Sequence, residues 1–100
     1  MSNGQVTILY FASARDATKT SQETLSIDSL RTAGGAQVSI PDLITALKAR
    51  HPALQLIFTT AIVAVNNAYV DRDGRSVDSG DIVAVKAGDE IAVIPPVSGG

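Results

Sequence analysis

The architecture of this chain follows from the stretch VSIPDLITALKARHP, which occupies residues 38–52. Its apolar side chains recur at i, i+3, i+4 and i+7 and form one stripe of an amphipathic helix: Ile40, Leu43, Ile44 and Leu47. Ser39 can cap the helix at its start, and Pro52 ends it. Because one short amphipathic helix must bury its stripe against something, we expect the rest of the chain to supply a sheet.

The residues before the helix predict a β-hairpin. Residues 6–11 are rich in β-branched and aromatic side chains, and residues 23–27 alternate polar with apolar. These two segments are expected to pair as antiparallel strands, with residues 12–22 as their connection. Residues 28–37 are expected to form a loop.

The residues after the helix predict further strands. Residues 53–60 are too apolar for an open loop and predict a short turn packed on the core. Strands are expected at 61–65 and 68–70, joined by a tight turn at Asn66-Asn67, and a further turn is expected at Asp73-Gly74. Two more strands, each entered through a Gly-Asp turn, are expected within 80–85 and 88–93. The pattern as a whole predicts an α+β domain, with a mixed sheet packed on one main helix.

The composition indicates one cytosolic domain and excludes several function classes. A chain of 100 residues with net charge −2 and no large basic cluster is not expected to bind nucleic acid. The N-terminus lacks the features of a signal peptide, and the apolar runs are too short to cross a membrane. The absence of cysteine and the presence of a single histidine, His51, leave no usual set of metal ligands. At the helix end, His51 is expected to complement the helix dipole rather than to act as a base.

The chain ends in a tail with a distinctive composition. The apolar run 91–94 is followed by Pro95, Pro96, Val97, Ser98, Gly99 and Gly100. The prolines end the strand and stiffen the exit, whereas the glycines carry no Cβ and leave a thread that can enter a narrow channel. We therefore divide the chain into a folded domain, residues 1–94, and an extended tail, residues 95–100, that presents the C-terminal carboxylate as a reagent. The plain alternative is a loose terminus.

The last fifteen residues, KAGDEIAVIPPVSGG at 86–100, resemble the ending of the small subunits of molybdopterin synthase. Tyr10-Phe11-Ala12 after the first strand, Arg50-His51-Pro52 at the helix end and residues 65–70 are similar to the same family. Residues 80–85 are closest to its eukaryotic members. The resemblance implies a ubiquitin-like β-grasp fold for residues 1–94, with the Gly-Gly tail extended beyond it.

The resemblance also implies a chemistry for the tail. A ubiquitin-activating-type adenylyl- and sulfurtransferase would use ATP to form an adenylate on Gly100 and would then convert it to a thiocarboxylate. Pro95, Pro96, Val97, Ser98 and Gly99 would thread into the active site of a partner. The chain itself would bind no cofactor and no metal.

The partner that the resemblance implies is the large subunit of the synthase, in a heterotetramer of two small and two large subunits. The carried sulfur would convert cyclic pyranopterin monophosphate to molybdopterin, in the biosynthesis of the molybdenum cofactor. General acids and bases would belong to the large subunit. Whether the chain should be called an enzyme is therefore open, since alone it would catalyse nothing.

Two alternatives share the terminal glycines. One is a sulfur carrier of another pathway, thiamine synthesis or tRNA thiolation, although Pro95-Pro96-Val97-Ser98 favours molybdopterin. The other is a ubiquitin-like protein modifier or interaction module. Arg15 and Asp89 are candidates for exposed partner contacts, with a solvated surface as the simpler expectation for both.

Overall fold

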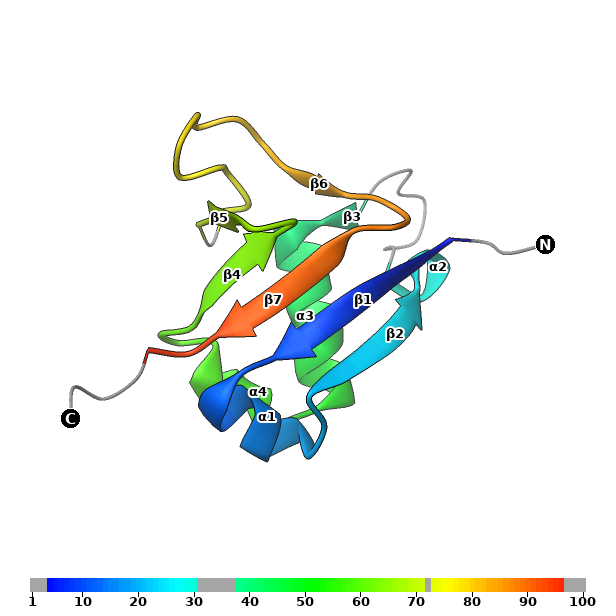
Figure 1. The fold of residues 1–100 in the computed structure, drawn as a ribbon, viewed down its shortest axis with the longest axis vertical. Helices are drawn as coiled ribbons and strands as arrows, with labels where there is room; N and C mark the ends of the chain where they lie inside the picture. The colour runs from blue at the N-terminus through cyan, green and yellow to red at the C-terminus, as the bar shows by residue number, and fades with distance from the viewer. Residues whose placement is uncertain (1–3, 31–37, 72, 97–100) are drawn as a thin grey trace.

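The protein is built on a mixed sheet of five strands, seen face-on in Figure 1. The computed structural model describes residues 4–30, 38–71 and 73–96. Across the sheet the strand order is β2 (Gln22–Ser26), β1 (Gln5–Tyr10), β7 (Glu90–Ile94), β4 (Ile62–Val65) and β5 (Ala68–Val70). Strands β1 and β7 run parallel, and the other neighbours are antiparallel. The predicted hairpin is confirmed, because β1 pairs with β2 from Gln5↔Ser26 to Leu9↔Gln22.

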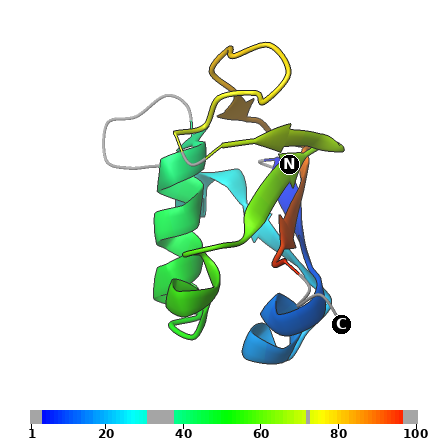
Figure 2. The ribbon, with the colours of Figure 1, turned by 90° about the vertical axis from the view of Figure 1, so that its left-hand side faces the viewer.

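Helix α3 (Ile40–Arg50) is the main helix, and it covers one face of the sheet (Figure 2). The Ser39 hydroxyl accepts a hydrogen bond from the backbone N–H of Asp42 at 3.1 Å, which confirms the predicted cap. Ile40, Leu43 and Leu47 are fully buried, and Ile44 is partly buried at the border of the stripe. The amphipathic stripe is thus confirmed, and the α+β architecture with it.

Three shorter helices accompany α3: α1 (Ala12–Thr18), α2 (Ile27–Leu30) and α4 (Leu54–Ile57). Helix α4 confirms the turn expected within 53–60, since Leu54 is fully buried and Phe58 nearly so.

Helix α1 corrects the expectation that residues 12–22 are a plain connection. It buries only Ala14 and therefore shows no apolar stripe in the sequence. Its last turn closes through Lys19, whose left-handed backbone places its N–H 2.8 Å from the carbonyl oxygen of Arg15.

Helix α2 corrects the end of the second strand and the start of the predicted loop. Ile27 and Leu30, three positions apart, both turn into the core, so the chain coils where a strand and then a loop were expected. Residues 31–37 of that loop lie outside the described residues.

The strand expected within 80–85 is shorter than predicted. Strand β6 (Ala84–Val85) pairs with β3 (Val38–Ser39) in a separate two-stranded sheet, and Ile82 forms an isolated antiparallel bridge with Arg75. The partner strand is itself two residues long, so Ile82 extends beyond it and is exposed. The expected turns are confirmed: Asn66 and Asn67 both have positive φ, and Gly74 donates to the carbonyl oxygen of Asp71 at 3.0 Å.

Candidate functional site

The tail leaves the sheet from its central strand. Strand β7 is hydrogen-bonded to β1 on one side and to β4 on the other, up to the pair Ile62↔Ile94. Ile91 and Val93 point into the core and are fully buried. Beyond the end of β1, the backbone N–H of Phe11 donates to the carbonyl oxygen of Val93 at 3.2 Å. The base of the tail is therefore fixed by both neighbouring strands and by the core.

The ladder ends where the prolines begin. Pro95 is buried against the body, and Pro96 is exposed. Because neither has an N–H, neither can continue the pairing of β7. Val97, Ser98, Gly99 and Gly100 lie outside the described residues, so the role assigned to these four positions, and to the tail as a unit, stays a prediction.

An apolar surface flanks the end of β7 on the face of the sheet that α3 does not cover. Phe11 is 46% exposed, Ile62 47% and Tyr69 54%. A hollow of about 170 Å³ on this face is lined by Leu9, Phe11, Ala64, Asn67, Tyr69, Glu90, Ala92 and Ile94. We call this surface, with Ile62 beside it, the outer sheet face. Large exposed apolar side chains in one patch are typical of a protein interface.

The sequence reasoning did not identify the outer sheet face. The sequence carried a signal for it, because the last four residues of β7, Ile91–Ile94, are all apolar. Ile91 and Val93 are buried in the core, and the alternate residues Ala92 and Ile94 place apolar side chains on the other face. Such double-sided apolar strands are expected in a sheet covered on both faces. What the sequence did not indicate was which strands lie side by side.

Asp89 is not the exposed residue that the sequence suggested. It is only 7% exposed, and its carboxylate accepts hydrogen bonds from the Asn66 side-chain amide at 3.0 Å and from the backbone N–H of Lys86 at 2.7 Å. The Asn66 amide oxygen in turn accepts from the backbone N–H of Glu90 at 2.9 Å. Asp89 therefore ties the entry of β7 to the β4–β5 turn. Arg15 is exposed, as expected.

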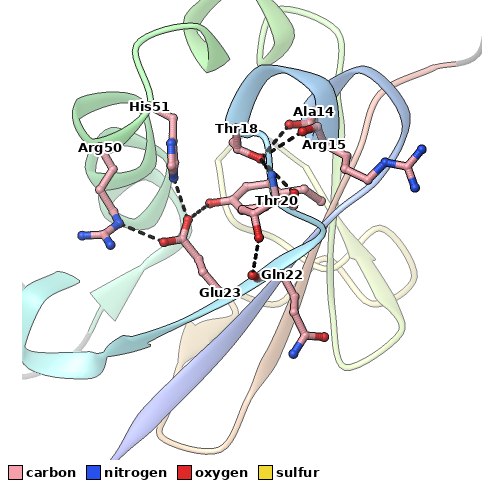
Figure 3. A network of polar contacts seen from close by, with 9 residues as sticks. Ala14, Arg15, Thr18, Thr20, Gln22, Glu23, Arg50 and His51 are labelled. Carbon is pink, nitrogen blue, oxygen red and sulfur yellow. Dashed lines mark hydrogen bonds and ion pairs between the residues drawn. The ribbon is translucent and has the colours of Figure 1, made fainter.

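A polar cluster that the sequence did not reveal ties the hairpin to the end of α3 (Figure 3). The Tyr10 hydroxyl donates to Glu23 at 2.5 Å, and Nε2 of His51 lies 2.7 Å from the same carboxylate oxygen. Nε of Arg50 donates to the other oxygen at 3.1 Å. The rings of Tyr10 and His51 meet edge to face. The carboxylate is thus surrounded by three partners from two separate segments.

The cluster perturbs two titrations. Burial alone would raise the pKa of Glu23, but the hydrogen bonds from Tyr10, His51 and Arg50 outweigh it and hold that pKa below its ordinary value. Burial, reinforced by the bond to Glu23, raises the pKa of Tyr10 above its ordinary value. Since the imidazole of His51 is engaged with Glu23, we interpret the cluster as a structural clamp.

Within the described residues, no group of three or more His, Cys, Asp or Glu side chains is placed to hold a metal ion. Nor does any helix in those ranges have the length and apolar character needed to span a membrane.

Comparison with known proteins agrees with the family resemblance and the fold. A model of the ThiS family matches residues 8–100. The chain is 33% identical over 96 residues to a "Molybdopterin synthase sulfur carrier subunit" of Chlamydomonas reinhardtii, covering 96% of this chain and 99% of that one. This similarity confirms the resemblance stated from the sequence, its eukaryotic character included.

Two solved structures show a similar fold. SAMP1 from Haloferax volcanii superimposes with a TM-score of 0.69 at 24% identity, covering 97% of this chain and all of that one. A chain of the protein–protein complex of subunits 1 and 2 of molybdopterin-converting factor from Helicobacter pylori has a TM-score of 0.58 at 20% identity, covering 96% of this chain and 99% of that one. The predicted ubiquitin-like β-grasp fold is thereby confirmed.

Proposed function

The chain belongs to the ThiS family, and on that premise we propose that it is the sulfur-carrier small subunit of a molybdopterin synthase. The observation that carries the proposal is the end of the chain: a central, fully anchored strand followed by Pro95-Pro96 and closed by Gly99-Gly100. A similarity to sulfur-carrier subunits that extends over 96 residues supports the same reading.

The chemistry begins at the carboxylate of Gly100. A carboxylate resists nucleophilic attack because its charge and resonance oppose it. An activating enzyme of the ubiquitin-activating type would join this group to AMP from ATP, with release of pyrophosphate. A persulfide then attacks the carbonyl carbon and displaces AMP, which gives an acyl disulfide. A thiol of the activating enzyme attacks the distal sulfur of that disulfide, forms a new disulfide with it and releases the thiocarboxylate. Its terminal sulfur is ionised and nucleophilic near neutral pH, as a thiolate is.

The folded body supplies position rather than catalytic groups. Because β7 is bonded on both sides, the base of the tail has a fixed position and a fixed direction when a partner binds it. The thiocarboxylate is then a tethered reagent at high local concentration in the partner active site. Conversion of cyclic pyranopterin monophosphate to molybdopterin would take place there, with acids and bases from the large subunit.

The outer sheet face is the surface that we assign to the partner. It flanks the end of β7, so a protein that receives the tail also meets Phe11, Ile62 and Tyr69. Burial of such side chains favours association by about 25 cal/mol for each Å² removed from water, and the entropy cost of binding is subtracted from this gain. The proposal includes an assembly of two small and two large subunits. It also includes a location in the cytosol, where ATP is available for the activation.

Intact-mass measurement tests the proposal. The purified chain is incubated with a ubiquitin-activating-type enzyme, ATP and a sulfur donor, and then with the large subunit and the pyranopterin precursor. We expect an oxygen-to-sulfur mass increase on Gly100 in the first step and molybdopterin in the second. A chain that ends at Gly99 is the control and should give neither. Isopeptide-linked products in place of the thiocarboxylate would identify a protein modifier instead.

A further inference from the structure

The edge of the sheet beside β5 holds a second apolar hollow, with a volume of about 390 Å³. Its lining includes Ile44 of α3, Phe58 beyond α4, Val63 of β4 and Val70 of β5. These four side chains belong to the core or pack against it, so their positions are set by the fold. We call this cavity the edge hollow.

The rim of the edge hollow is exposed and mostly apolar, with Thr60 and Asp71 as its exposed polar members. Ile62, Tyr69 and Val77 line it with 47%, 54% and 63% of their surface exposed. Val77 lies in the connection between β5 and β6, where its N–H donates to the carbonyl oxygen of Tyr69 at 3.0 Å. The neighbouring Ser76 forms a β-bridge with Val70. Paired backbone thus holds the rim against the edge strand.

The edge hollow is continuous with the outer sheet face. Tyr69 lines both hollows. Ile62, on the rim, pairs with Ile94 of β7, which lines the outer sheet face directly before the prolines. A protein that covers the outer sheet face and receives the tail would therefore also reach the mouth of the edge hollow.

We propose that the edge hollow receives an apolar side chain, of the size of Leu, Met or Phe, from the large subunit. The inference rests on the proposed function, which supplies that partner. The large subunit is the partner assigned here because the edge hollow is continuous with the outer sheet face and because a chain of similar fold is found in a two-subunit complex. An apolar anchor seated in a preformed cavity is the usual energetic centre of a protein–protein interface, and a charged one would lose its hydration there.

The test uses a matched pair of exposed valine and isoleucine side chains from the same connection. Val77 lines the hollow, and Ile82, 68% exposed, is not among its lining residues. We expect Val77→Asp to weaken binding of the large subunit about thirtyfold, as loss of an anchor site does, and Ile82→Asp to leave it unchanged. Calorimetric titration measures both affinities, and thermal unfolding checks that both variants keep the fold. Formation of the thiocarboxylate by the activating enzyme should be unaffected in either.

Other outcomes separate this inference from the proposed function. If Val77→Asp binds the large subunit like the wild type while Phe11→Asp on the outer sheet face does not, the edge hollow is not a docking site and the proposed function stands. If Val77→Asp impairs the activating enzyme and spares the large subunit, the assigned partner is wrong. If the unaltered chain acquires no sulfur at all, the proposed function fails, and this inference with it.

Discussion

The side chains on the two faces of the central sheet have different roles. On the face toward α3, Ile91 and Val93 of β7 are fully buried in the core. On the opposite face, Ala92 and Ile94 of the same strand line a hollow in the surface beside Phe11. Neighbouring residues of a strand point to opposite sides, so one stretch of five residues serves both stability and docking. Substitutions at alternate positions should therefore separate the two properties.

The largest effect is expected from a matched pair of isoleucines on β7. Ile91→Ala opens a cavity in the core and should lower the free energy of unfolding by about 2–5 kcal/mol. Ile94→Ala removes the same atoms from the outer face, where solvent or small shifts can fill the space, and should cost about 1 kcal/mol. Urea unfolding measures both. Equal losses would show that the two faces are not distinct in the way described.

A substitution in the tail should impair sulfur transfer without changing the stability of the fold. Gly99→Val places a β-branched side chain next to the reacting carbonyl, where a narrow channel would exclude it, and should slow molybdopterin formation about a hundredfold or more. The unfolding midpoint should not change, because the position follows the last strand. Ser98→Ala is the control and should be far milder. If the folded Gly99→Val protein works at the wild-type rate, the tail does not thread a narrow channel and the glycines are a loose terminus.

A substitution on the outer sheet face should change the affinity for the large subunit but not the stability of the fold. Phe11→Asp replaces an exposed aromatic ring with a charge and should weaken association with the large subunit about thirtyfold. The fold should persist because Phe11 is the N-cap residue of α1, a position that favours aspartate. Calorimetric titration gives the affinity and circular dichroism the fold. An unchanged affinity would remove the outer face from the interface.

The smallest effect is expected at the polar cluster, which joins Tyr10 of the core to the end of α3 and lies away from the outer sheet face. The pKa of Glu23 is lower in the folded chain than its ordinary value of 4.5, so the cluster adds stability above that pH and loses it as the pH falls through the folded pKa. Glu23→Gln should lower stability at pH 7 by about 1–2 kcal/mol and flatten its dependence on pH below about 4.5.

Glu90→Gln is the control for that measurement, because Glu90 is exposed and its carboxylate lies outside the polar cluster. It should leave the acid limb of the stability curve in place. Urea unfolding from pH 3 to 7 provides the comparison. An acid limb that is as steep in Glu23→Gln as in the wild type would show that the cluster does not contribute to it.

The tail was assigned from local sequence features and stays a prediction, whereas the surfaces beside it are assembled from distant segments and were not predicted. Two terminal glycines behind two prolines indicate a threaded carboxylate from the residues alone. The outer sheet face instead joins Phe11, Tyr69 and Ile94, which come from three separate segments. Glu23 meets His51 across 28 positions of sequence, and no spacing rule relates them. Asp89 was misjudged because carboxylates are usually exposed, and the amide that covers this one comes from Asn66.

The helix α3 with its cap and the first hairpin follow from short-range preferences, namely periodicity and capping. The chemistry of the tail is implied by the family resemblance and stays a prediction. Other features depend on what packs against a segment. Helix α1 exists around a single buried alanine, and β6 is only as long as the two-residue strand that it pairs with. The central place of β7, which turns an ordinary apolar strand into a rigid base for the tail, comes from its pairing with β1 and β4. Such pairings join residues far apart in sequence, so their free energy is gained only when the whole sheet closes on α3.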